Sequence, residues 1–138
     1  MKTLVIAEHD NSRLPTATLN AVMAATRFGG EVDVLLAGHA CEAAVAQAQT
    51  LAGVTRVLKV EAAHYAEPLA ENLAALVQQV ASTGGYRAVL FGASSFGKNI
   101  APRVAALLDV AAVSDVVAIT APGRYERPIY AGNVMVNI

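Results

Sequence analysis

The sequence has few of the residues that form disulfides or bind metal ions in small proteins. Its single cysteine, Cys41, excludes an internal disulfide. No group of cysteines and histidines has the spacing of a metal site, so we predict no metal and interpret Cys41 as a small buried residue. A chain without disulfides is compatible with a reducing bacterial cytoplasm, which is where we expect it.

Long basic and long apolar runs are also absent. The 10 Lys and Arg are interspersed with 11 Asp and Glu, for a net charge of -1. Without a basic run that could neutralise a row of phosphates, we exclude electrostatically driven binding to nucleic acid. No apolar stretch approaches the roughly 20 residues of a membrane span, and the N-terminal run is too short for a signal peptide. We therefore expect a soluble intracellular domain with no membrane insertion.

The common nucleotide motifs are missing from the first strand-to-helix turn. This turn reads AEHDNSRLP and contains neither GxGxxG nor GxxxxGK[ST], which excludes a Rossmann dinucleotide site and a P-loop. Glu8 and Asp10 could form the acidic pair of a receiver domain, but the third strand ends in Glu61 instead of the required aspartate. The histidines lie on different turns without the spacing of a triad: His9, His39 and His64. We predict no catalytic residue.

Short apolar runs and Ala-rich helical segments alternate along most of the chain. The predicted strands are Leu4–Ala7, Val32–Ala37, Val54–Val60 and Tyr86–Ala93. The predicted helices are Thr16–Phe28, Cys41–Leu51 and Pro68–Val80, and the glycines that would end them are Gly29-Gly30, Gly53 and Gly84-Gly85. A chain of 138 residues is about one domain long. We predict a single α/β domain over residues 1–138, with a three-layer, doubly wound, mostly parallel sheet.

The C-terminal segment has a different pattern. From Ser114 it reads SDVVAITAPGRYERPIYAGNVMVNI, which predicts three strands, a turn at Ala121-Pro122-Gly123 and no helix. Such a run is typical of an antiparallel meander added at a sheet edge. The last letters, NVMVNI, stop within a strand pattern, so we expect the chain to be truncated short of its natural C-terminus.

The best candidate for a ligand site is the stretch FGASSFGKNIAPR, from Phe91 to Arg103. It leads from a strand into a helix, so backbone amides and the positive helix end would face a ligand at the sheet's C-terminal edge. With Asn99 as N-cap, Pro102 would fall in the first turn. The candidate anion site comprises Gly92, Ser94, Ser95, Gly97 and Lys98. Alternatively, the glycines only let the turn close and the serines bond to local backbone; the residues alone leave both interpretations open.

Three segments, taken in order, carry a family resemblance. They are LVIAEHDNSRL, FGASSFGKNIAPRVAALLDVAAVSDVVAI and RPIYAGN. Together they resemble the N-terminal domain of the alpha subunit of electron transfer flavoprotein, over nearly the whole chain. The part from Gly97 to Asp115 is the most specific, because GK, APRVA, LD and SD at fixed spacing seldom occur together by chance.

The resemblance implies an adenine nucleotide alpha hydrolase-like fold and a role as the scaffold domain of a heterodimeric electron carrier. Such a carrier has no substrate chemistry of its own. It would take electrons from flavin dehydrogenases, such as acyl-CoA dehydrogenases, and deliver them to a quinone oxidoreductase. This chain would be the N-terminal domain of a longer alpha subunit and would pack against the beta subunit.

The resemblance also implies where the cofactors lie. FAD in the intact protein would be bound mainly by a C-terminal domain that this chain lacks, and AMP by the beta subunit. No cofactor is expected within residues 1–138, and the loop from Phe91 to Arg103 is then interpreted as a tight turn. The alternative function is a free-standing AMP- or ATP-binding module of the universal-stress type, in which Gly92 to Lys98 would bind the phosphates.

Overall fold

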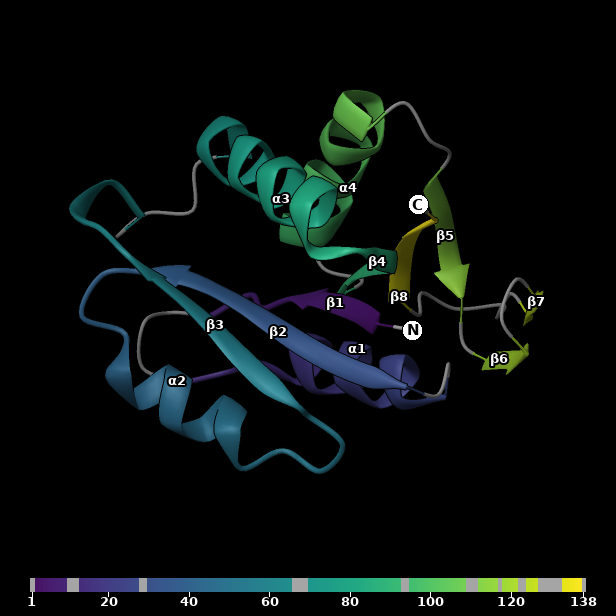
Figure 1. The fold of residues 1–138 in the computed structure, drawn as a ribbon, viewed down its shortest axis with the longest axis horizontal. Helices are drawn as coiled ribbons and strands as arrows, with labels where there is room; N and C mark the ends of the chain where they lie inside the picture. Colours follow the sequence, from purple (N-terminus) through teal and green to yellow (C-terminus); the bar gives the residue numbers. More distant parts are fainter. Residues whose placement is uncertain are drawn as a thin grey trace.

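Strands and helices alternate through the first two-thirds of the protein. The computed structural model describes residues 2–9, 13–27, 30–65, 70–92, 95–108, 112–116, 118–121, 124–126 and 133–137 (Figure 1). The first elements are β1 (Lys2–Ile6), α1 (Thr16–Thr26), β2 (Glu31–Gly38), α2 (Glu42–Gln49), β3 (Arg56–Glu61), the short 3-10 turn η1 (Ala63–Tyr65), α3 (Ala70–Gly84), β4 (Tyr86–Phe91) and α4 (Ser95–Leu108). The predicted alternation is confirmed over this part of the chain.

These first four strands form a parallel sheet. β1 lies between β2 and β4, and β3 pairs with the outer side of β2. The six-stranded sheet has the order β3-β2-β1-β4-β8-β5, so its first four strands follow the order of a doubly wound fold. The predicted α/β class is therefore confirmed.

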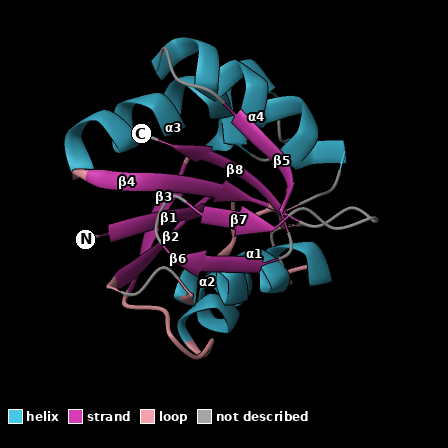
Figure 2. Cartoon of the chain, turned by 90° about the vertical axis from the view of Figure 1, so that its right-hand side faces the viewer, coloured by secondary structure: helices cyan, strands magenta, loops and turns pink. Residues whose placement is uncertain are grey.

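Helices cover both faces of the sheet, as Figures 1 and 2 show. Side chains alternate along each strand, so Val5 of β1 packs with α1 and α2, whereas Leu4 and Ile6 pack with α3 and α4. The same alternation places Leu36 of β2 on the first face and Leu35 on the second. Both faces of β1 and β2 are buried, which explains their nearly continuous apolar runs.

Glycines stand between the helices and the strands that follow them, as predicted. Gly30, Gly53 and Gly85 adopt φ angles of 81°, 87° and 71°. Residues with a Cβ rarely adopt this left-handed conformation, so glycine is the favoured residue for such a chain reversal. Gly29 lies outside the described residues.

The C-terminal strands do not confirm the predicted meander at a sheet edge. They are β5 (Ala112–Val116), β6 (Ala118–Ala121), β7 (Arg124–Glu126) and β8 (Asn133–Asn137). β6 and β7 form a separate antiparallel pair around the predicted turn, whose residues 122 and 123 lie outside the described part. β8 lies inside the main sheet, antiparallel to both β4 and β5. An antiparallel strand needs no crossover helix, so β8 can fill the open side of β4.

Candidate functional site

The order in which the chain adds strands to the sheet reverses between β1 and β4. The chain first builds outward from β1 to β2 and β3, and then returns to place β4 on the other side of β1. The connections that follow β1 and β4 therefore leave the same edge of the sheet side by side (Figure 1). In open α/β sheets this carboxyl edge is the usual place for a ligand. The predicted anion loop begins here, at the end of β4.

The β1–α1 connection is held by a buried hydroxyl at this edge. Thr18 of α1 is fully buried, and its Oγ1 accepts a hydrogen bond from the backbone N–H of Glu8 at 3.0 Å. The same hydroxyl donates to the Glu8 carbonyl at 2.9 Å. One side chain thus satisfies both backbone groups of Glu8. The backbone N–H and carbonyl of Glu8 therefore have their hydrogen-bond partner within the fold.

Two further side chains tie this connection to β2 and α2. Nε2 of His9 lies 2.7 Å from the carbonyl oxygen of Ala37, next to the end of β2. The backbone N–H of Leu14 donates to Oε1 of Gln47 on α2 at 2.8 Å. Both bonds join segments that are far apart in the sequence. They give His9 and Gln47 structural roles that need no ligand.

Gly92 packs directly against the first turn of α1. It is buried, and a Cβ built on it would lie 2.9 Å from Cβ of Ala17 and 3.0 Å from the Ala17 carbonyl carbon and oxygen. Real Cβ atoms hardly ever approach other heavy atoms so closely. The glycine at the end of β4 is therefore explained by close packing against a helix. This supports the tight-turn interpretation at Gly92.

The other residues of the predicted anion site are described only in part. Ser94 lies outside the described residues, and Ser95, Gly97 and Lys98 form the first turn of α4, with only their backbone described. The anion site built from Gly92, Ser94, Ser95, Gly97 and Lys98 accordingly stays a prediction.

The predicted start of α4 is wrong. The helix begins at Ser95, so Asn99 is not its N-cap and Pro102 lies within the helix. Asn99 is exposed, and its Oδ1 accepts a bond of 3.5 Å from Nε of Arg103 on the next turn. Buried residues on both sides of Pro102 pack against the sheet and α3: Ile100, Ala101, Val104 and Ala105. Their packing outweighs the local cost of the proline, which removes one helical hydrogen bond.

Cys41 is fully buried, which confirms its predicted character. Burial, followed by the charge of Glu61, raises the pKa of the Cys41 thiol above its ordinary value. The thiol is therefore protonated near neutral pH and unsuited to nucleophilic attack. Among the residues that the structure describes, no group of three or more His, Cys, Asp or Glu could hold a metal ion.

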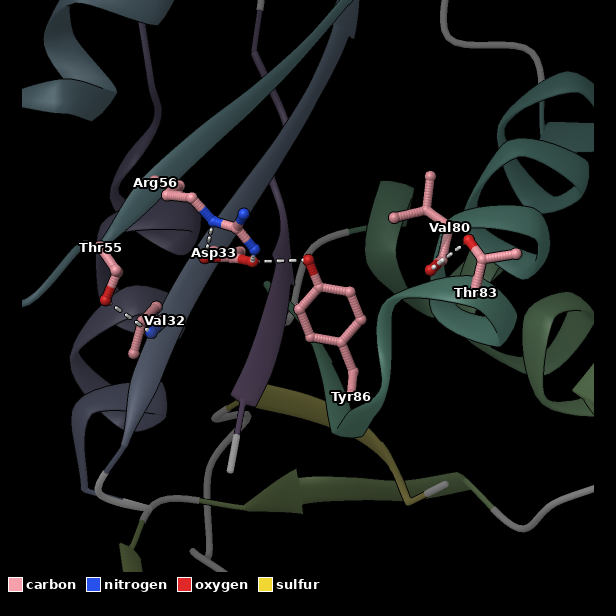
Figure 3. A network of polar contacts seen from close by, with 7 residues as sticks. All are labelled: Val32, Asp33, Thr55, Arg56, Val80, Thr83 and Tyr86. Carbon is pink, nitrogen blue, oxygen red and sulfur yellow. Dashed lines mark hydrogen bonds and ion pairs between the residues drawn. The ribbon is translucent and has the colours of Figure 1, made fainter.

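A second polar cluster lies at the opposite, amino edge of the sheet, and the sequence analysis missed it. Asp33 of β2 is fully buried, and its carboxylate accepts two bonds from the Arg56 guanidinium of β3: Nε to Oδ1 at 3.2 Å and Nη2 to Oδ2 at 2.6 Å. The hydroxyl of Tyr86, on β4, donates to Oδ2 at 2.6 Å. Figure 3 shows Asp33 between the two donors. We call Arg56, Asp33 and Tyr86 the amino-edge cluster.

The amino-edge cluster keeps Asp33 charged. Burial alone would raise the pKa of Asp33, but the hydrogen bonds from Arg56 and Tyr86, with the charges of Arg56 and Lys2, outweigh it and lower the pKa below its ordinary value of 3.8. Burial, followed by the bond to Asp33, raises the pKa of Tyr86 far above its ordinary value. The phenol therefore keeps its proton and donates a hydrogen bond to the carboxylate.

Among the helices that the structure describes, none combines the length and the apolar character that crossing a membrane requires.

Comparison with known proteins identifies the family. The family model for the electron transfer flavoprotein domain matches residues 3–138. The chain is 45% identical over 138 residues to an electron transfer flavoprotein subunit alpha of Pseudomonas aeruginosa, which covers 100% of this chain and 44% of the relative. It is 50% identical over 135 residues to a protein of the same name from Bradyrhizobium diazoefficiens, covering 98% and 42%. A mitochondrial subunit alpha of Arabidopsis thaliana is 41% identical over 143 residues, covering 100% and 39%.

The chain thus spans less than half the length of these curated relatives. The match to the family model nevertheless covers almost the entire chain, including both edges of the sheet. The chain belongs to the electron transfer flavoprotein domain family.

Proposed function

We propose that residues 1–138 form the N-terminal scaffold domain of the alpha subunit of a heterodimeric electron transfer flavoprotein. The scaffold packs against the beta subunit and gives a flavin-bearing domain a rigid base. The intact carrier takes electrons from flavin dehydrogenases, such as acyl-CoA dehydrogenases, and delivers them to a quinone-linked acceptor. It acts as a carrier and has no substrate of its own.

The observation that carries this proposal is the family match over residues 3–138. The structure supports it physically, because a parallel sheet covered by helices on both faces is a stiff unit. The polar groups described at the carboxyl edge, on Thr18, His9 and Gln47, bond to the protein's own backbone. Such an edge is suited to holding its own shape.

The cofactors belong elsewhere in the proposed complex. The close contact of Gly92 with Ala17 gives this glycine a packing role that needs no ligand. Following the family resemblance, we place FAD on the C-terminal domain of the intact alpha subunit and AMP on the beta subunit. When bound there, the flavin supplies the redox chemistry, and this domain supplies only its position.

Co-expression tests the scaffold. The chain, carrying an affinity tag, is expressed with a beta-type subunit of the same family, and the purified complex is analysed for subunit ratio. A stable complex in a one-to-one ratio is expected, because permanent heterodimers bury large surfaces. A chain that purifies alone, although folded by circular dichroism, would contradict the proposal.

The comparisons do not support the alternative of a universal-stress type module. Titration with AMP and ATP by calorimetry tests it directly. We expect no heat of binding at micromolar concentrations. If binding does occur, Lys98→Gln should weaken it and Lys59→Gln, a matched lysine on β3, should not; that pattern would establish a phosphate site in the loop after β4 and refute the scaffold interpretation of this loop.

A further inference from the structure

The amino-edge cluster joins strands that are not neighbours. Arg56 is the first residue of β3, the outermost strand on its side of the sheet. Tyr86 is the first residue of β4, which lies beyond β2 and β1. Asp33 lies on β2 and bonds to both, so the contact passes across β1 (Figure 3). The sheet's backbone ladders connect only adjacent strands. The side chains therefore add a link that the backbone cannot make.

The start of β4 is shaped to allow this link. The pairing of β1 with β4 shifts register after Tyr86, where Lys2 pairs with Tyr86 and Thr3 pairs with Ala88. Because of this irregularity, Tyr86 packs on the same face as Val89 and Phe91, whereas strict alternation would place it on the other face. Asp33 and Tyr86 thereby come within hydrogen-bond distance.

Two neighbours of the Tyr86 ring fit the same arrangement. A Cβ on Gly84 would lie 2.2 Å from Cε2 of the ring, so the glycine leaves the space that the ring occupies. Nζ of Lys2 lies 4.9 Å from the ring centroid, within the range of a cation–π contact. The register shift, Gly84 and Lys2 thus all lie beside the phenol that donates to Asp33.

Side chains add to the backbone bonds at the amino end of the edge strand. Beside the ladder, the start of β3 is held by Thr55, whose hydroxyl accepts from the N–H of Val32 at 3.1 Å. The side chain of Arg56 is half exposed, whereas that of Asp33 is fully buried. Edge strands have one unpaired side, so they open more readily than central strands. The carboxylate of Asp33 is the buried point to which the exposed arginine is fastened.

We propose that Asp33 is the centre of an acid-sensitive clamp, which fastens the edge strand β3 to the bulged start of β4 and releases both before the rest of the sheet opens. The clamp is closed when the carboxylate is charged. In that state it accepts all three hydrogen bonds. When the carboxyl is protonated, it can keep at most one hydrogen bond with Tyr86. It also loses its charge attraction to Arg56.

The direction of the pH effect follows from the groups that face Asp33. These are Arg56 from β3, Tyr86 from β4 and Lys2 from β1, while Glu31 of β2 acts on Arg56. Together they favour the charged carboxylate, so its pKa is lower in the folded than in the unfolded protein. The stabilisation is therefore fully present above the ordinary value of 3.8 and is lost as the pH falls through the lowered value.

Hydrogen exchange with mass spectrometry, on the full chain, tests the clamp. We expect Asp33→Asn to reduce the protection of peptides covering β3 and the start of β4 by about a hundredfold at neutral pH, because a bond to a charge is replaced by a neutral one. Peptides from α4 should lose less protection. In the wild type the same two regions should lose protection as the pH falls below about 4, after correction for intrinsic exchange rates.

Two further variants keep the test decisive. Tyr86→Phe removes only the phenol hydroxyl, should open β4 more than β3, and serves if Asp33→Asn fails to fold. Glu42→Gln breaks an exposed ion pair to Lys59 on the same edge strand, 3.6 Å apart, and should change neither region. Equal loss of protection throughout the sheet, or unchanged protection of β3 in Asp33→Asn, would overturn the proposal.

Discussion

The two edges of the sheet are held together in different ways. At the carboxyl edge, the neutral hydroxyl of Thr18 bonds to the backbone of Glu8, ten residues away in the sequence, and the charged pairs there, Lys59 with Glu42 and Glu61, are exposed. At the amino edge, one buried carboxylate bonds to side chains that are 23 and 53 residues away. The first edge is fixed mainly by its own connections. The second is fixed by a charge that links distant strands.

This difference indicates where the protein is sensitive to pH. Neutral hydrogen bonds contribute modestly to stability and respond little to pH. A buried charge with its hydrogen bonds contributes more, and its contribution depends on its ionisation. The β1–α1 connection at the carboxyl edge, where related folds bind ligands, should therefore keep its shape across pH. The amino edge should be the part that acid opens.

Asp33→Asn should give the largest loss. We expect the free energy of unfolding to fall by about 3 kcal/mol at pH 7, because the buried site loses its charge-assisted bonds. Urea unfolding followed by circular dichroism measures it, and Glu42→Gln, at an exposed ion pair, should leave the midpoint unchanged. A loss no larger than that of Glu42→Gln would remove the contrast between the edges.

Gly92→Ala should give the second largest loss, at the carboxyl edge. The added Cβ meets the helix backbone at Ala17, and such overpacking costs about 2 kcal/mol. Part of this cost should disappear when Gly92→Ala is measured in an Ala17→Gly background, because one of the close contacts is then gone. If alanine at position 92 is neutral for stability, the packing explanation for this glycine is wrong.

Thr18→Val should give the smallest loss of the three. It removes both hydrogen bonds to Glu8 while keeping the side chain's size, so we expect about 1 kcal/mol. Thr18→Ser keeps the hydroxyl and separates the hydrogen bonds from the packing of the methyl group. Thermal unfolding at pH 7 and at about pH 4 should show the same loss for Thr18→Val, since no charge is involved. A strongly pH-dependent loss would contradict the neutral character of the Thr18 contact.

The sequence alone predicts the elements whose patterns are local. The runs around Leu4, Val34 and Val89 become buried strands, and the spacing of Leu73 and Val77 gives the buried face of α3. Cys41 is buried, as predicted. In each case the signal lies within one turn of helix or a few residues of strand.

The features that depend on distant partners are not predictable in this way. Local signals placed the start of α4 at Asn99, but the packing of Ile100 and Ala101 allows the helix to begin earlier and to include Pro102. The position of β8 between β4 and β5 depends on which strand edges are open. Asp33 within VDVLLA was the one available signal of the amino-edge cluster, because a charge in an apolar strand needs a partner.

The proposed role of this domain is to position a redox group that it does not itself hold. The flavin content of the purified chain, measured by its visible absorbance after release of any bound cofactor, tests the claim most directly. We predict no stoichiometric flavin on residues 1–138, and flavin only when the proposed C-terminal domain is present. One flavin per chain on residues 1–138 alone would contradict the claim.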